Sequence, residues 1–225
     1  MNNNVVNKIR ETYKVDNQKL LRLSNLNFLF ELGYPEKFLS KIDEEIIINS
    51  FPISFPFKDI NLYNKNYLDL GCGVGLDCYY AKSNSAKIVL GVDLSYSLLN
   101  NKLNFIKLVC DINKSLPFKE QHFFEIINLN GSFNQIIKKF SLLNNLYKIL
   151  KDDGLIIIND LLWIGSKKEF QYYKNDENAW IFNIGGCLTE NSIWNIEART
   201  FLKIALFDKF EKEYPVQKYR LILKK

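Results

Sequence analysis

The chain has 225 residues, a net charge of +5 and 47% hydrophobic residues. This length fits one domain with an elaboration, and the hydrophobic fraction suffices for a packed core, which argues against disorder. The basic excess is small and the lysines are scattered, so the composition does not indicate a face for nucleic acid. No stretch reaches the ~18 apolar residues of a membrane span, and residues 1–10 lack the apolar core of a signal peptide. We therefore expect a cytoplasmic protein with reduced thiols.

Residues 1–60 predict a helical N-terminal cap segment. Residues 5–32 are dense in leucine and predict helix in pieces, and Gly33-Tyr34-Pro35 ends it. A second helix is predicted over Glu36 to Asn49. The prolines within residues 51–57 exclude helix there and predict an extended connector. We expect this cap to pack over the mouth of a ligand pocket in the main domain, residues 61–225.

From residue 66 onward, predicted strands and helices alternate. The strands are expected over residues 66–70, 87–92, 104–109, 123–129 and 155–159. The helices are expected over 75–83 and 134–150, with a short helix N-capped by Ser95 between the second and third strands. Such alternation predicts an α/β fold, a mainly parallel sheet with helices on both faces. Ligands of such sheets bind beyond the C-terminal ends of the strands.

A glycine-rich loop follows the first predicted strand. Residues 66–77 read NYLDLGCGVGLD, in which Asp69 precedes three glycines at alternate positions. A strand that turns through glycines into a helix brings backbone N–H groups close to a ligand, and glycine has no Cβ to block that approach. The dinucleotide fingerprint would need glycine where Leu76 stands. An ordinary glycine turn is the alternative, but Asp93 lies after the next strand, close to the ~20 residues expected of a ribose-binding acid.

The pattern D-x-G-x-G-x-G resembles the first motif of class I S-adenosylmethionine (SAM) dependent methyltransferases. The resemblance implies a Rossmann-like class I methyltransferase fold and SAM as cofactor. It also implies that Asp69 and the glycine loop hold the amino-acid end of SAM, and that Asp93 takes the ribose hydroxyls. Asp111 is placed to accept from the adenine amino group, with Ile112 stacking on the base; a surface aspartate is the alternative. The predicted SAM-binding residues are Asp69, Gly71, Cys72, Gly73, Gly75, Asp77, Asp93, Leu94, Asp111, Ile112 and Asn130.

Several segments resemble the arsenite methyltransferases, a class I subfamily. They comprise residues 76–79 (LDCY), 115–118 with 123–127, 150–160, 180–188 and 219–221. That family holds arsenic(III) with thiolates, because soft metalloids prefer sulfur ligands. In an ungapped alignment, two of its cysteine positions fall on Gly131 and Asn183. We therefore expect the fold and the SAM chemistry, but neither tight arsenite binding nor arsenite methylation.

Cysteine and histidine are too dispersed to predict a metal centre. The four cysteines have no C-x-x-C spacing, and the single histidine, His122, lies in a polar turn. Zinc sites need clustered cysteine and histidine ligands. We expect no metal site and a surface role for His122.

The methyl acceptor is not identified by the sequence. Residues 161–200 are expected to form an acceptor-side elaboration, and the candidate pocket residues are Tyr13, Asn130, Ser132, Trp180 and Asn183, each with a packing or turn alternative. Methyl transfer is an in-line displacement that needs positioning and no dedicated nucleophile, so no catalytic residue is assigned. The favoured interpretation is a small-molecule methyltransferase.

Two other interpretations stay open. One is a methyltransferase that acts on protein or nucleic acid, although residues 128–131 lack the Asn/Asp-Pro-Pro-Tyr/Phe motif of amino-methylating DNA enzymes. The other is a SAM-binding module without activity. The sequence does not indicate an oligomeric state.

Overall fold

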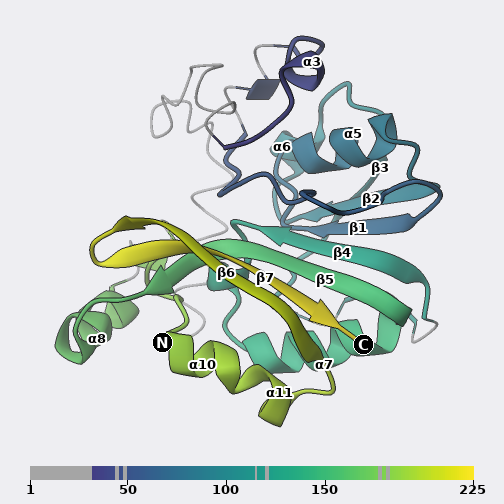
Figure 1. The fold of residues 1–225 in the computed structure, drawn as a ribbon. Coiled ribbons are helices and arrows are strands. Elements are labelled where there is room, and N and C mark those ends of the chain that lie inside the picture. The colour runs from purple at the N-terminus through teal and green to yellow at the C-terminus, as the bar shows by residue number, and fades with distance from the viewer. Residues whose placement is uncertain are drawn as a thin grey trace.

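A seven-stranded sheet forms the centre of the molecule. The structure is a computed structural model, and it describes residues 32–43, 46–47, 50–114, 116–119, 122–176, 179–180 and 183–225. The strand order is β3-β2-β1-β4-β5-β7-β6 (Figure 1). The strands are β1 (Asn66–Leu70), β2 (Ile88–Asp93), β3 (Ile106–Val109), β4 (Phe124–Asn130), β5 (Leu150–Trp163), β6 (Lys203–Glu213) and β7 (Val216–Lys224). Strands β1 to β5 are parallel, and β7 pairs antiparallel with both β5 and β6.

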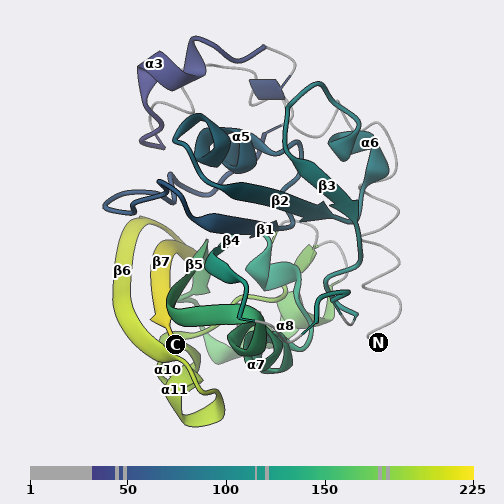
Figure 2. The ribbon, with the colours of Figure 1, turned by 90° about the vertical axis from the view of Figure 1, so that its right-hand side faces the viewer.

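Helices cover both faces of this sheet. Helices α5 (Leu76–Ser83) and α6 (Tyr96–Leu99) lie on one side, whereas α7 (Lys139–Ile149), α10 (Glu190–Trp194) and α11 (Ile196–Arg199) lie on the other (Figure 1, Figure 2). The remaining elements are α3 (Glu36–Leu39), the 3-10 helix η1 (Phe133–Gln135) and α8 (Lys167–Asn175). The predicted Rossmann-like, mainly parallel architecture is confirmed. Within the described ranges, every helix is too short or too polar to cross a membrane.

Alternation along β1 divides the core between the two faces. Tyr67 packs in a cluster with Cys78 of α5, while Leu68 and Leu70 pack in a larger cluster with Leu143 of α7. Successive side chains of a strand point to opposite faces, so one apolar strand serves both layers. Asp69 therefore lies on the α5 face, at the end of the strand.

Three predicted elements differ from the structure. The helix expected over residues 36–49 is interrupted after Leu39, because the amides of Lys41 and Ile42 bond to carbonyls three residues back and form turns. Residues 46–47 are again helical, and residues 44–45 and 48–49 lie outside the described residues. The helix expected from residue 134 begins at Lys139, after η1 and a break. Strand β5 begins at Leu150, with an irregularity in its pairing with β4 before Ile126.

The C-terminal hairpin of β6 and β7 is absent from the predicted elements. Strand β6 is the edge of the sheet, and several of its side chains, including Asp208 and Lys209, are exposed. Charged residues on an edge strand discourage pairing with other chains, and they also remove the apolar run that identifies a buried strand. The helix N-capped by Ser95 is confirmed, because Ser95 Oγ accepts from the amide of Leu98 at 3.4 Å.

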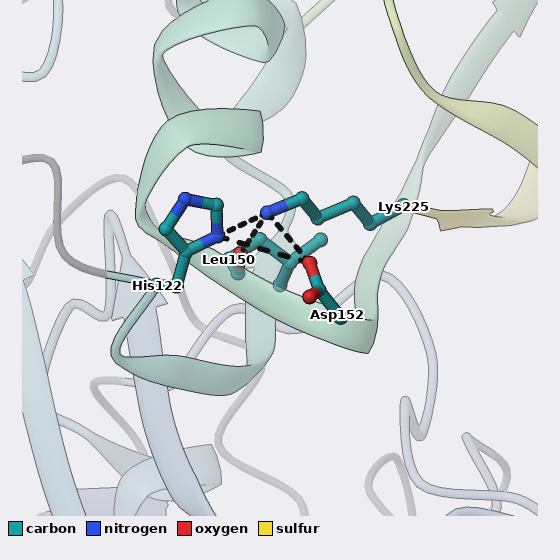
Figure 3. Close-up of polar contacts among 4 residues, drawn as sticks. All are labelled: His122, Leu150, Asp152 and Lys225. Atoms are coloured by element: carbon teal, nitrogen blue, oxygen red, sulfur yellow. Dashed lines mark hydrogen bonds and ion pairs between the residues drawn. The ribbon is translucent and has the colours of Figure 1, made fainter.

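Lys225 joins the ends of several segments at the N-terminal edge of the parallel strands. Its Nζ donates to the carbonyl of Leu150 at 3.0 Å, lies 3.1 Å from Asp152 Oδ1 and contacts Nδ1 of His122 (Figure 3). The side chain of His122 is 55% exposed. The predicted surface role of His122 is therefore confirmed.

Candidate cofactor and acceptor site

A pocket opens at the C-terminal ends of β1, β2 and β4. Its empty space, open solvent at the mouth included, is about 940 Å³. The residues that line it are Tyr34, Ser50, Phe51, Pro52, Asp69, Gly71, Cys72, Gly73, Val74, Leu76, Asp77, Asp93, Leu94, Leu98, Asp111, Ile112, Asn113, Asn130, Gly131, Ser132 and Gln135. All but one of the residues predicted to bind SAM are in this lining. The exception is Gly75.

The glycine loop is held against β2 by its backbone. The amides of Gly71 and Cys72 both donate to the carbonyl of Val92, at 2.7 and 3.0 Å. A Cβ built at Gly73 would meet no atom within 4 Å, so this position faces open space in the pocket. A Cβ at Gly75 would lie 2.2 Å from the Phe105 ring. Gly75, the N-cap of α5, is therefore a glycine for packing against Phe105, not for approach to a ligand.

Asp93 is positioned by two backbone amides. Its Oδ2 accepts from Gly73 at 2.8 Å and its Oδ1 accepts from Ser95 at 2.8 Å. Burial raises the pKa of Asp93, and these hydrogen bonds oppose that shift. Each carboxylate oxygen has a second lone pair, so the group can also accept from hydroxyls of a ligand.

Two further carboxylates, Asp69 and Asp77, lie close together in the pocket floor. Asn128 Nδ2 donates to Asp69 Oδ1 and to Asp77 Oδ2, at 3.1 Å in both cases. Asp77 also accepts from the hydroxyl of Tyr34 at 2.7 Å and from Asn130 Nδ2 at 2.9 Å. Burial, followed by the charge of Asp77, raises the pKa of Asp69 well above its usual value. Burial likewise raises the pKa of Asp77.

The opposite wall of the pocket lies after β3. Asp111 and Ile112 line it as predicted, together with Asn113 and Gln135, which the sequence analysis missed. Asn113 Nδ2 donates to the carbonyl of Gln135 at 3.2 Å, and Asn113 Oδ1 accepts from the amide of Ile137 at 2.8 Å. These bonds tie the segment after β3 to the segment after β4. No local pattern indicates Gln135, because it reaches the pocket through η1.

The predicted acceptor residues have different fates. Ser132 lines the pocket, and its Oγ donates to the carbonyl of Leu70 at 2.5 Å. Trp180 and Asn183 are not in the lining: the Trp180 ring is buried against Leu94, and Asn183 Nδ2 donates to the carbonyl of Gly131 at 2.5 Å. Neither of these two side chains lines this pocket, and their role toward an acceptor stays a prediction. Their polar groups are turned toward backbone carbonyls, which Trp180 Nε1 finds at Lys174, 3.0 Å away. Tyr13 lies outside the described residues.

The pocket is completed by residues that precede β1 and that the sequence analysis did not name as site residues. Tyr34 and residues 50–52 line the pocket. Asn130 links the two parts, because its Nδ2 donates to the carbonyl of Ser54 at 2.8 Å and its Oδ1 accepts from the amide of Ile53 at 3.0 Å. The expected packing of the cap over the pocket mouth was the only signal that could have found these residues.

The pocket matches the chemical groups of SAM. Two buried carboxylates suit an ammonium group, Asp93 suits a ribose diol, and the apolar side chains of Leu98 and Ile112 suit a base. Among the described residues no group of three or more histidine, cysteine or acidic side chains could hold a metal ion.

Residues 68–158 match a family model described as a methyltransferase domain. A search of curated proteins found no match. Among solved structures, the arsenic (III) S-adenosylmethionine methyltransferase CrArsM from Chlamydomonas reinhardtii has a TM-score of 0.64 and 15% identity, over 83% of this chain and 71% of that chain. The S-adenosylmethionine dependent methyltransferase from Mesorhizobium loti has a TM-score of 0.54 and 16% identity, over 73% and 93%. The [4+2]-cyclase SpnF has a TM-score of 0.59 and 12% identity, over 72% and 76%.

At these identities the structural likeness shows a shared fold, and the domain match covers residues 68–158. The matched range contains the glycine loop, Asp93, Asp111 and β4, which together build most of the pocket. The chain thus matches a methyltransferase domain over residues 68–158 and has the fold of class I SAM-dependent methyltransferases.

Proposed function

We propose that this protein transfers the methyl group of SAM to a small-molecule acceptor. The observation that carries the proposal is the composition of the pocket wall: Tyr34, Phe51 and Pro52 from the cap face the strand-end residues Asn130 and Ser132. Side chains from both segments thus surround the acceptor side, which suits a compact molecule.

The residues of the chain have separate roles in this proposal. The backbone of residues 71–74 and the carboxylates of Asp69 and Asp77 hold the amino-acid end of the cofactor, and Asp93 holds the ribose. Asp111 and Ile112 hold the base. When bound, SAM supplies an electrophilic methyl group on a sulfonium. The pocket walls orient the acceptor toward that group and exclude water, which is the main protein contribution to an in-line displacement.

Proton removal from the acceptor is not assigned to a residue. Burial and the neighbouring Asp77 raise the pKa of Tyr34 well above its usual value, so its hydroxyl keeps its proton. The hydroxyl donates a hydrogen bond to Asp77 Oδ1. Tyr34 thus contributes a polar wall. We also propose that residues 1–60 form the cap, and residues 161–200, with α8 and α10, support the acceptor side.

A SAM-binding protein with another activity is the second candidate. The likeness to the [4+2]-cyclase SpnF favours it, because that protein shares the fold and is named for a different reaction. Incubation of the protein with SAM and a metabolite extract separates the two. Methyl transfer predicts a product 14 mass units heavier than its precursor, together with S-adenosylhomocysteine.

Calorimetry tests the cofactor site directly. Asp93→Ala should weaken SAM binding by roughly 1.5–3 kcal/mol, because the ribose loses hydrogen bonds to a charged group. The matched control is Asp152→Ala, at a carboxylate that is 90% exposed at the opposite edge of the sheet. Equal SAM affinity in the two variants would contradict the role of Asp93.

A further inference from the structure

Asn128 lies between the two buried carboxylates of the pocket floor. A single amide nitrogen donates to Asp69 Oδ1 and to Asp77 Oδ2, at 3.1 Å each, so each acid receives one of its two hydrogens. Asn128 is fully buried and is not in the pocket lining, whereas both aspartates are. It therefore acts from behind the pocket and sets the spacing of the two acids.

The side-chain amide of Asn128 satisfies both acids, but its own oxygen, Oδ1, is buried without a hydrogen-bond partner among the described residues. An unpaired buried acceptor is costly, and the arrangement persists because both amide hydrogens point at carboxylates. The side chain thus gives up one hydrogen bond of its own to hold two acids together.

No cation offsets the acid pair within the described residues. The titratable groups around it are Tyr34 from the cap, Tyr67 on β1, Cys72 in the glycine loop and Cys78 on α5. In the described part of the chain, neither lysine, arginine nor histidine lines the pocket or forms an ion pair with either acid.

Two close carboxylates in a buried site cannot both ionise without a large cost. Neutral donors reduce that cost: the amides of Asn128 and Asn130 favour the charged form of Asp77. They do not remove the repulsion between the two charges. A positive ligand would.

We propose that Asn128 is a positioning residue that holds Asp69 and Asp77 as one acid pair, which shares a proton in the cofactor-free protein and releases it to solvent when the ammonium group of SAM enters. The inference rests on the proposed function, since it assigns the amino-acid end of SAM to this floor. The proton leaves a carboxyl oxygen for bulk water, and the freed carboxylate accepts a hydrogen bond from the ammonium group. Cofactor binding is then linked to pH.

The test is calorimetric titration of the full chain with SAM in two buffers of different ionisation enthalpy at the same pH. The dependence of the observed heat on the buffer counts the protons released. We expect a net release near neutral pH, and a SAM affinity that rises with pH until the pair is ionised. Asp77→Asn leaves a single buried acid without its charged neighbour, so the proton release should be smaller than in the wild type, and burial of Asp69 accounts for what remains.

Asn128→Leu tests the positioning role. Without the two amide hydrogen bonds the charged pair is less favoured, so the pH midpoint of SAM affinity should shift upward, and affinity at neutral pH should fall by roughly tenfold or more. The matched control is Asn159→Leu, because Asn159 is equally buried on the neighbouring strand β5, and both atoms of its amide lack partners in the described structure. Its pH midpoint should equal that of the wild type. Thermal unfolding of both variants separates lost folding from lost binding.

The outcomes separate the two proposals. SAM binding by the wild type with a buffer-independent heat would refute the proton release while leaving the proposed function intact. An unchanged midpoint in folded Asn128→Leu would refute the positioning role, because a merely structural residue would lower affinity without moving the midpoint. No SAM binding by the wild type would refute the proposed function and this inference together.

Discussion

Buried charge is arranged in opposite ways in two regions: the pocket floor, which we call the cofactor half, and the support region beyond β4 and β5. In the cofactor half, Asp69 and Asp77 meet only neutral donors among the described residues. In the support region, Asp160 and Lys139 are both buried outside the pocket lining and lie near enough for each charge to favour the other. The acids of the cofactor half can thus be neutralised by a positively charged ligand, whereas Asp160 and Lys139 offset each other within the protein.

In the support region, hydrogen bonds connect the segment after β4 with β5 and with the loop that contains Asn183. Asp160 accepts from the amides of Asn134 and Leu161, at 2.8 Å each, and Lys139 Nζ donates to the carbonyl of Asn134 at 3.1 Å. Asn134 Nδ2 in turn donates to the carbonyl of Asn183 at 2.9 Å. A side chain at Gly186 would lie 1.7 Å from the Asn134 carbonyl oxygen, so this contact leaves no space. A ligand can therefore change the charge balance of the cofactor half, whereas contacts within the protein hold the support region.

The largest expected effect is on the pH dependence of stability in the support region. Burial raises the pKa of Asp160 to about 7. The folded protein therefore favours protonated Asp160. This stabilisation is complete below the pKa of the unfolded chain, about 4, and is lost as pH rises to 7. Asp160→Asn should remove this loss, so its free energy of unfolding should gain up to about 4 kcal/mol on wild type between pH 4 and 7. Chemical denaturation across that range measures it.

The control for this prediction is Asp152→Asn, at a carboxylate that is 90% exposed. Its pH dependence should match that of the wild type. A parallel pH profile in Asp160→Asn would show that Asp160 is ionised in the folded protein at low pH.

The next effect breaks the cofactor half alone. Gly73→Val should reduce SAM affinity by more than about 3 kcal/mol, because a branched side chain would fill the open space beside the loop and strain a backbone with φ of 54°. Calorimetry with SAM measures the loss. Gly75→Val is the contrast, since its side chain would clash with Phe105 and should lower the unfolding temperature more. Wild-type SAM affinity in Gly73→Val would mean that the loop is only a turn.

A smaller effect on stability is expected from substitutions at Asn183, which is outside the pocket lining. Asn183 has φ of 60°, and it donates to the carbonyl of Gly131. Asn183→Ala should cost about 2 kcal/mol of stability, from the lost hydrogen bond and from alanine in the left-handed region. Asn183→Gly should cost less, because glycine adopts that backbone freely. Denaturant unfolding ranks the variants, and an equal cost for both would show that the backbone contributes nothing.

The smallest effect is an expected absence of binding. The positions that carry cysteine in arsenite methyltransferases, Gly131 and Asn183, lie side by side here, and they are joined by a hydrogen bond instead of two sulfurs. Cys72 and Cys78 do approach each other, but burial raises the pKa of Cys72 to about 11 and that of Cys78 well above its usual value. Arsenite coordination needs thiolates, so equilibrium dialysis should show no tight binding. Methylarsenical formation dependent on Cys187 would overturn this expectation.

Much of the cofactor half could be predicted from the sequence, because its signals are local. The glycine loop, Asp93 and Asp111 each follow directly on a strand, and parallel strands bring such ends together. Alternation of apolar segments was enough for the central sheet. The edge strand β6 was missed because its exposed charged residues interrupt any apolar run. Strand β7 was also missed, although residues 219–223 form a buried run.

The sequence by itself determined the fold class and the ends of the strands that face the pocket. Only the tertiary structure decided which distant side chains meet there: Tyr34 reaches Asp77 across 43 positions, and Asn128 reaches Asp69 across 59. The same is true of Trp180 and Asn183, whose side chains donate to the backbone carbonyls of Lys174 and Gly131 and are not in the pocket lining. Hydrogen-bond partners and burial depend on the packing of separate segments, and no local pattern of residues encodes that packing.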